Sequence, residues 1–149
     1  MEKLRIQAID GKDLEIISAY LQNGITTVSD LKFLPSFKRF IIVFSRFMWE
    51  ETKDKLSRNK RIRSIIDFSN VVSAQSRYIS QNDKDKILEF VGFSENSRFN
   101  EKHETGILHL LFSGGGIVQL EIEFLSCKLT DYGKPWYTGR KPNFQFERE

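Results

Sequence analysis

The sequence predicts an α+β domain of about seven mostly antiparallel strands that form a curled sheet or partly closed barrel, with one helix near the N-terminus. Apolar and polar residues alternate along most of the chain, and a 3.6-residue period appears once. Because this leaves a single strand–helix–strand crossover, the sheet has to be mainly antiparallel. We expect one domain over residues 1–133, followed by an irregular C-terminal tail over 134–149 in which prolines and a glycine interrupt any ladder.

The opening of the chain predicts one strand and the helix. Leu4, Ile6 and Ala8 alternate with polar residues, as in a strand with one buried face. Asp10 is a suitable helix N-cap, and the apolar residues that follow recur with the helical period. The pattern stops at Asn23-Gly24, where we expect the helix to end.

Six later runs have strand character and are separated by polar or glycine-containing segments. In order, they are 25–33, 37–49, 62–79, 87–93, 106–112 and 117–125. The run 62–79 is long for one strand, so we expect a bend or bulge near Ser69-Asn70. Residues 50–60 and 94–105 are polar and are expected to form exposed loops. The glycines of 113–116 permit the positive φ angles of a tight hairpin between the last two runs.

Composition excludes several classes of protein. Of the 149 residues 40% are hydrophobic, which excludes collagen-like and wholly disordered chains. The longest apolar stretches, 40–44 and 107–112, are far shorter than the roughly 20 residues of a membrane helix, and we find no secretory signal. The single Cys127 cannot form an intrachain disulfide. We therefore expect a cytoplasmic protein with no membrane partner.

Motifs of known catalytic chemistry are missing, so we predict no catalytic residue, no metal site and no cofactor. Residues 113–116 resemble a phosphate-binding loop, but a strand follows them where such a loop requires a helix, so a turn is the better interpretation. An enzyme of unrecognised type stays open as an alternative. It would require four side chains to meet in one cleft: Glu121, Glu123, Asp131 and His109.

The strongest charge cluster lies between residues 53 and 63, where six cations accompany one acid, Asp54. The cations are Lys53, Lys55, Arg58, Lys60, Arg61 and Arg63. Such a cluster can contact phosphates, and aromatic residues nearby, such as Trp49 and Tyr78, could stack on bases if they share its face. The alternative is a loop whose charge only keeps it in solvent.

Polar and aromatic residues also interrupt the strands elsewhere. Arg46 lies in an apolar run, so it either points outward or is buried against a carboxylate as an internal ion pair. If Arg46, Trp49, Arg77 and Trp136 instead converge, they would form a polar pocket walled by tryptophan.

Several short motifs, taken together, resemble a known family. They are Ile9-Asp10, Asp13-Leu14, Ile17-Ser18-Ala19, Leu21-Gln22, Leu34-Pro35, Arg39-Phe40, Arg46-Phe47, Trp49-Glu50, Gln75-Ser76-Arg77, Phe112-Ser113-Gly114-Gly115-Gly116 and Leu120-Glu121-Ile122-Glu123. The family that they resemble is an uncharacterised group of short alphaproteobacterial proteins catalogued as a domain of unknown function. The resemblance implies a cytoplasmic bacterial protein of one domain, and it implies no activity, cofactor or catalytic residue. The lysine-rich loop and the residues after Tyr137 depart from the family pattern.

Two hypotheses for function precede the enzyme alternative. The first is a non-catalytic binding module that presents Arg46, Trp49, Arg77 and Trp136 to a protein or a small ligand. The second is binding of RNA or single-stranded nucleic acid through residues 53–63. Edge strands left unpaired would also allow a homodimer.

Overall fold

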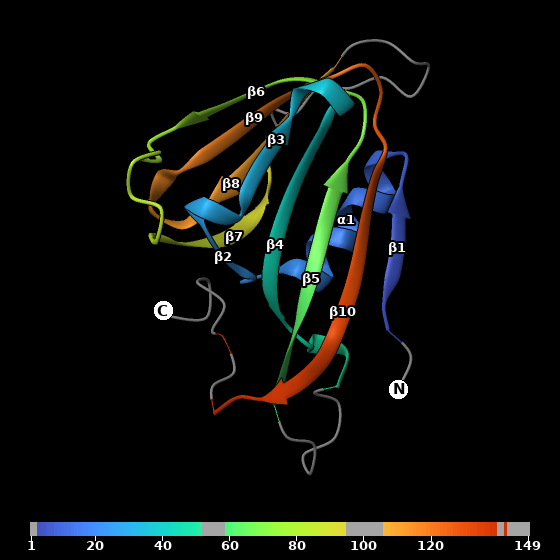
Figure 1. The fold of residues 1–149 in the computed structure, drawn as a ribbon. Helices are drawn as coiled ribbons and strands as arrows, with labels where there is room; N and C mark the ends of the chain where they lie inside the picture. Colours follow the sequence, from blue (N-terminus) through green and yellow to red (C-terminus); the bar gives the residue numbers. More distant parts are fainter. Residues whose placement is uncertain (1–2, 52–58, 95–105, 140–141, 143–149) are drawn as a thin grey trace.

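Ten strands form one curled sheet that does not close, and one helix lies inside the curl (Figure 1). The computed structural model describes residues 3–51, 59–94, 106–139 and 142. The strands are β1 (Arg5–Ala8), β2 (Ile25–Thr27), β3 (Leu31–Leu34), β4 (Arg39–Phe47), β5 (Lys60–Phe68), β6 (Val71–Arg77), β7 (Ile87–Phe93), β8 (Gly106–Phe112), β9 (Ile117–Ile122) and β10 (Cys127–Tyr137). The helix is α1 (Gly11–Leu21), and the short 3-10 turns are η1 (Val28–Asp30), η2 (Pro35–Phe37), η3 (Trp49–Glu51) and η4 (Ser113–Gly115).

The strand order is β1-β10-β5-β4-β2-β7-β8-β9-β6, with β3 paired to β4 beside β2, and every pairing is antiparallel. The α+β class and the curled antiparallel sheet agree with the sequence, but the strand count does not. Two predicted runs each form two strands. The run 25–33 is divided by η1 into β2 and β3, and the run 62–79 is divided into β5 and β6 at Ser69-Asn70, where Asn70 has a φ of 61°. The third additional strand is β10.

β10 corrects the expectation of an irregular tail from residue 134. It continues to Tyr137, and its register against β5 shifts between Tyr132 and Trp136. Gly133 has a φ of 75° within this bulge, and Pro135, which has no N–H for the ladder, also lies there. The glycine and proline therefore mark an irregularity inside a strand, not the end of regular structure.

Helix α1 begins and ends where its sequence indicates. The Asp10 side chain accepts a hydrogen bond from the Asp13 backbone N–H at 2.9 Å. After Leu21 the chain turns through Asn23, whose φ is 60°, into Gly24. A Cβ on Gly24 would lie 2.9 Å from the Leu21 carbonyl oxygen, so no larger residue fits this close approach.

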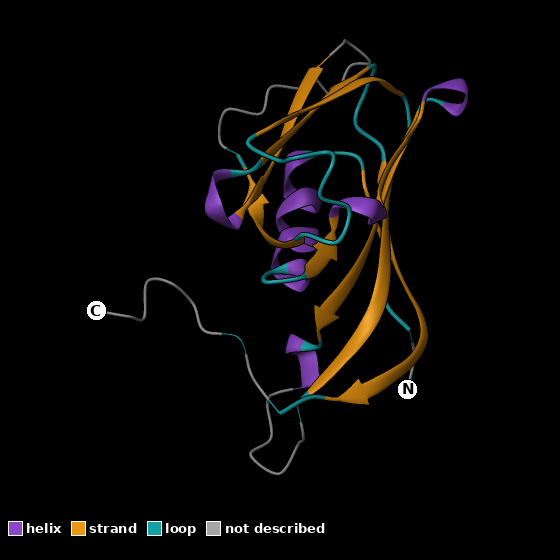
Figure 2. Cartoon of the chain, turned by 60° about the vertical axis from the view of Figure 1, so that its left-hand side comes forward, coloured by secondary structure: helices purple, strands orange, loops and turns teal. Residues whose placement is uncertain are grey.

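The core lies between α1 and the inner face of the sheet. Leu14, Ile17 and Leu21 of α1 are buried there with alternate residues of the strands, and Phe44 and Phe90 meet edge to face at 5.9 Å. Figure 2 shows α1 on one side of the long strands only. On the other side of β10, β5 and β4, Figures 1 and 2 show no strand or α-helix of the described chain, although Phe47, at the end of β4, is fully buried there.

The β8–β9 hairpin confirms the interpretation of residues 113–116 as a turn. Gly114 and Gly115 have φ angles of 83° and 90°, and the Phe112 N–H donates to the Gly116 carbonyl at 2.8 Å. Among the residues placed in the structure, no helix combines the length and the apolarity that crossing a membrane requires.

Candidate functional site

Arg46 is the charged residue inside the apolar strand β4, and carboxylates hold it in the interior. Its side chain is fully buried; Nε and Nη2 donate to Asp131 at 2.8 and 2.7 Å, and Nη1 and Nη2 donate to Glu50 at 3.0 and 2.7 Å. Nη1 also donates to the Phe47 carbonyl at 3.4 Å. These five contacts match the five N–H groups of a guanidinium. Arg46 therefore forms the internal ion pair that the sequence left open, and it joins β4 to β10.

The surroundings of this ion pair fix its charge state. Burial alone would raise the pKa of Asp131, but hydrogen bonds from Arg46 and from Ser64 Oγ, at 2.6 Å, outweigh burial and hold the pKa below its ordinary value. Burial also disfavours the charge of Arg46, yet Asp131 and Glu50 raise its pKa. Both partners are therefore ionised at neutral pH.

The other three residues of the first predicted site do not surround Arg46. Trp49 lies in η3 and donates from Nε1 to the Gln22 carbonyl at 3.0 Å. Trp136 is paired with Arg61 near the carboxyl end of β10 and is 39% exposed. Arg77 ends β6 and is exposed, and Figure 1 places that end of β6 far from the end of β10. The structure thus brings Arg46 and Trp49 to one end of β4 and leaves Arg77 apart.

The structure describes three of the six cations of the predicted basic cluster, and all three lie on β5. Lys53, Lys55 and Arg58 lie outside the described residues. Lys60 pairs with Glu51 at 3.0 Å and lies 5.5 Å from the centre of the Tyr137 ring. Arg61 donates to the Ser45 carbonyl at 2.8 Å; burial lowers the pKa of Arg61, and the charge of Glu89 opposes that effect. Arg63 is exposed.

Pairing register brings Arg61 and Arg63 together with cations from four other strands. Paired residues of antiparallel strands point to the same face, and successive residues alternate. Ile62, Ser64 and Ile66 of β5 are buried on the inner face, so Arg61 and Arg63 point to the outer face. We call the outer side of β1, β10, β5, β4 and β3 the open face. Its charged members and its exposed or half-buried aromatic members are Arg5, Lys32, Arg39, Arg61, Arg63, Asp67, Lys128, Tyr132 and Trp136.

The open face has a charge balance unlike that of the rest of the chain. It holds six of the 23 Lys and Arg residues and one of the 20 Asp and Glu residues, and Glu89 of β7, whose charge acts on Arg61, lies at its margin beyond β2. Its net charge therefore exceeds the +3 of the whole chain, and the remainder of the sequence has more acids than bases.

The cations of the open face differ in what they contact. Arg39 forms an ion pair with Asp67, and Arg61 is held by Ser45. The remaining four cations make no ion pair with any residue in the described ranges: Arg5, Lys32, Arg63 and Lys128. Two aromatic residues lie among them, Tyr132 opposite Arg63 and Trp136 opposite Arg61.

The four residues of the enzyme alternative have separate partners. Asp131 is bound to Arg46 inside the sheet, and Glu123 pairs with Lys38 at 3.1 Å. Glu121 accepts from Ser73 Oγ at 3.1 Å, and His109 Nε2 lies 2.8 Å from Gln119 Oε1. Asp131 is buried whereas Glu121 is exposed, so these side chains do not face one common point.

Cys127 and the described histidine do not form a metal site. Cys127 is buried with an unpaired thiol, and burial raises its pKa to about 12, which keeps it protonated. Within the described ranges, no group of three or more His, Cys, Asp or Glu side chains is placed to hold a metal ion.

Sequence reasoning missed most of the open face. Arg5, Lys32, Arg39 and Lys128 lie far apart in the chain and form no local cluster. Their one signal is that each occupies a polar position of an alternating run, which indicates only that it points away from the core. Strand order and register are needed to show that these positions lie side by side.

A comparison with family models extends the resemblance seen in the sequence. A model described as "Protein of unknown function (DUF2948)" matches residues 4–144, which include all ten strands and the helix. No curated protein and no solved structure matches the chain significantly. The match confirms the resemblance to an uncharacterised family, while the alphaproteobacterial origin stays a prediction. The chain belongs to the DUF2948 family, whose function is unknown.

Proposed function

We propose that this chain is a binding module that holds single-stranded nucleic acid, RNA in the first place, on the open face. The observation that carries the proposal is the concentration of positive charge there, six cations against one carboxylate in a chain of net charge +3. The phosphates of a nucleic acid suit such an extended basic surface, because each contact with Lys or Arg releases counterions condensed on the polyanion.

Aromatic residues on the same face favour nucleic acid over other polyanions. Trp136 is 39% exposed beside Arg61, and Tyr132 is half-buried beside Arg63. Single-strand binding proteins combine cations that follow the backbone with rings on which bases stack. The predicted nucleic-acid hypothesis therefore moves from residues 53–63 to the sheet surface and keeps Arg61 and Arg63.

Three further lysines gather at the Trp136 end of β10. Lys3, Lys60 and Lys134 line a hollow of about 640 Å³ beside the β10 bulge, together with Ile62 and Pro135. Gly133, Lys134 and Pro135 directly precede Trp136. Lys60 and Ile62 alternate with Arg61 along β5 and so point away from the open face, and this hollow is not part of the proposed nucleic-acid site.

We place this activity in the cytoplasm. Cys127 is an unpaired, buried thiol, which suits a reducing compartment. RNA is available there as a partner.

The test is fluorescence anisotropy with a labelled oligouridylate of about 12 nucleotides, measured over a series of salt concentrations. We expect the affinity to fall with salt, and Arg63→Gln to make the slope of log K against log salt shallower by about 0.7, one phosphate contact. Trp136→Ala should weaken binding by about 5- to 150-fold through lost stacking.

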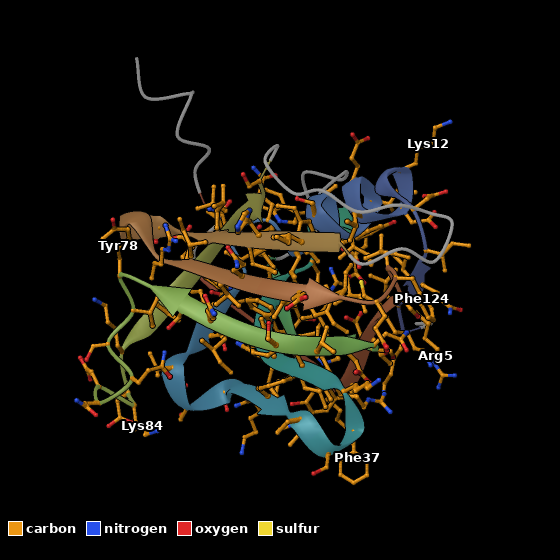
Figure 3. The ribbon with its side chains drawn as sticks, turned by 90° about the horizontal axis from the view of Figure 1, so that it is seen from above. Arg5, Lys12, Phe37, Tyr78, Lys84 and Phe124 are labelled. Atoms are coloured by element: carbon orange, nitrogen blue, oxygen red, sulfur yellow. The ribbon has the colours of Figure 1, made fainter. Side chains whose placement is uncertain are left out.

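Two control variants remove equivalent groups elsewhere. Lys12→Gln removes an exposed cation from the helix side, and Tyr78→Ala removes a ring that is 80% exposed at another edge of the molecule (Figure 3). Both should bind like the original protein. Absence of binding at low salt, or equal effects of Lys12→Gln and Arg63→Gln, would contradict the proposal. Binding that survives Trp136→Ala unchanged and is equally strong for heparin would reduce the open face to a general polyanion surface.

A further inference from the structure

The sheet stops short of closing where β3 and β6 face each other. β3 pairs with β4 and β6 pairs with β9, and no described strand pairs with the other edge of either. A backbone hydrogen bond bridges the gap at one end, and the β2–β7 ladder closes it at the other. The Val71 N–H donates to the Lys38 carbonyl at 2.8 Å, and the Val28 N–H extends the β2–β7 ladder by donating to the Lys86 carbonyl at 3.1 Å. The seam is therefore fixed at its ends and unpaired in its middle.

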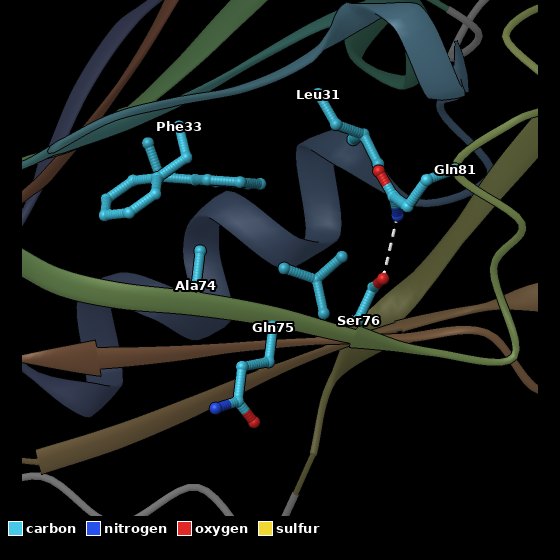
Figure 4. Close-up of a pocket in the computed structure, with 8 residues that line it drawn as sticks. Leu31, Phe33, Ala74, Gln75, Ser76 and Gln81 are labelled. Atoms are coloured by element: carbon cyan, nitrogen blue, oxygen red, sulfur yellow. Dashed lines mark hydrogen bonds between the residues drawn. The ribbon is translucent and has the colours of Figure 1, made fainter.

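A cavity of about 320 Å³ lies in this unpaired middle (Figure 4). We call it the seam pocket; it lies between Leu31 and Phe33 of β3 and Ala74 and Ser76 of β6. Phe40 and Val118, both almost fully buried, line it from the core. Its volume is within the range of small-molecule sites, about 300–1,000 Å³.

The polar groups of the seam pocket are few and neutral. Gln81 Nε2 donates to Ser76 Oγ at 2.8 Å, which leaves the Gln81 carbonyl oxygen as an acceptor and the Ser76 hydroxyl as a donor (Figure 4). Gln75 points to the opposite side of β6 (Figure 4). The residues that line the pocket include no charged side chain. An ionic ligand would lose its hydration there without a counter-charge.

We propose that the seam pocket binds a neutral small molecule with an apolar, flat body and one amide-like polar group. The body would replace water against Leu31, Phe33 and Ala74, and the polar group would pair with Ser76 and Gln81. This site is separate from the open face and does not depend on nucleic-acid binding. It also differs from the ligand site that the sequence predicted, which consists of Arg46, Trp49, Arg77 and Trp136.

A pair of probes with the same ring system tests the chemistry of the pocket. 2-Naphthamide is neutral and carries a donor and an acceptor, whereas 2-naphthoate has the same body with a negative charge. In a titration to about 1 mM followed by methyl NMR, we expect 2-naphthamide to shift the signals of Leu31, Ala74 and Val118. 2-Naphthoate should bind about tenfold more weakly or not at all. No shift with 2-naphthamide, or equal shifts with both probes, would overturn the proposal.

Variants on β6 separate pocket binding from surface adsorption. Ala74→Phe should fill the pocket and abolish binding, whereas Val72→Phe, at a position 42% exposed on the same strand, should leave it intact. Ser76→Ala keeps the cavity and should reduce the preference for the amide, which keeps the proposal testable if Ala74→Phe fails to fold. Unchanged binding in Ser76→Ala and in a folded Ala74→Phe protein would overturn it. Trp136→Ala should not affect either probe.

Discussion

At the scale of single residues, the pair of Arg46 and Asp131 places two charges inside the sheet, where charges are costly to bury. Two opposite charges inside a sheet lose their hydration, and only complete hydrogen bonding compensates for that loss. Arg46 has a partner for each of its N–H groups, and Asp131 accepts from Arg46, Ser64 and the Leu4 backbone N–H. Removing Arg46 therefore leaves Asp131 buried without a counter-charge, whereas removing Asp131 leaves Arg46 with Glu50 alone.

We predict that Arg46→Met lowers the free energy of unfolding by about 3–5 kcal/mol, because Asp131 then remains buried without its counter-charge. Urea denaturation measures this change. Arg63→Met is the matched control, since it removes an exposed arginine from the neighbouring strand and should change stability by no more than about 0.5 kcal/mol. Similar losses in the two variants would show that the ion pair has no special role.

The depressed pKa of Asp131 predicts a loss of stability in acid. A carboxyl whose pKa is lower in the folded state stabilises the fold above its unfolded pKa, about 3.9, and that contribution disappears as pH falls through the folded pKa. Urea denaturation from about pH 6 to pH 2 should therefore show declining stability in the original protein. Asp131→Asn should be less stable at neutral pH and decline less in acid; parallel curves for the two proteins would contradict this assignment.

At the scale of elements, the corner between β5 and β6 depends on one backbone conformation. Asn70 has a φ of 61°, in the left-handed region that asparagine and glycine tolerate. Asn70→Val should therefore cost about 1–3 kcal/mol, and Asn70→Gly should cost much less. Thermal unfolding of both variants provides the measurement. A valine variant as stable as the glycine variant would mean that the corner adapts without strain.

The contrast between α1 and β10 shows which elements can be predicted from local sequence. The cap at Asp10, the apolar period and the stop at Asn23-Gly24 are local signals, and α1 has these bounds. In β10, the buried row consists of Cys127, Leu129 and Asp131. The carboxylate of Asp131 interrupts the apolar–polar alternation by which a strand is predicted from sequence. That carboxylate is acceptable there because Arg46, 85 residues earlier, neutralises it. No pattern within the strand contains this information.

At the scale of the whole molecule, the open face is a product of strand order. Arg5, Lys32, Arg63 and Lys128 come from four strands spread over most of the chain, and each alone is an ordinary solvent-exposed cation. The +3 net charge gave no direct sign of where the charge gathers. The seam pocket was equally hidden, because it depends on where the curled sheet ends. β1 and β6 end the strand order, and association of two copies through these strands stays a prediction.

The place of β10 also determines when this protein can acquire its native form. The last strand lies between β1 and β5, and β1 pairs with no other described strand. While the chain emerges from the ribosome, its first strand must wait for a partner more than a hundred residues away, so the final assembly is a late, non-local step. A nascent or truncated chain without β10 would expose two unsatisfied strand edges, which makes it a substrate for chaperones and proteases.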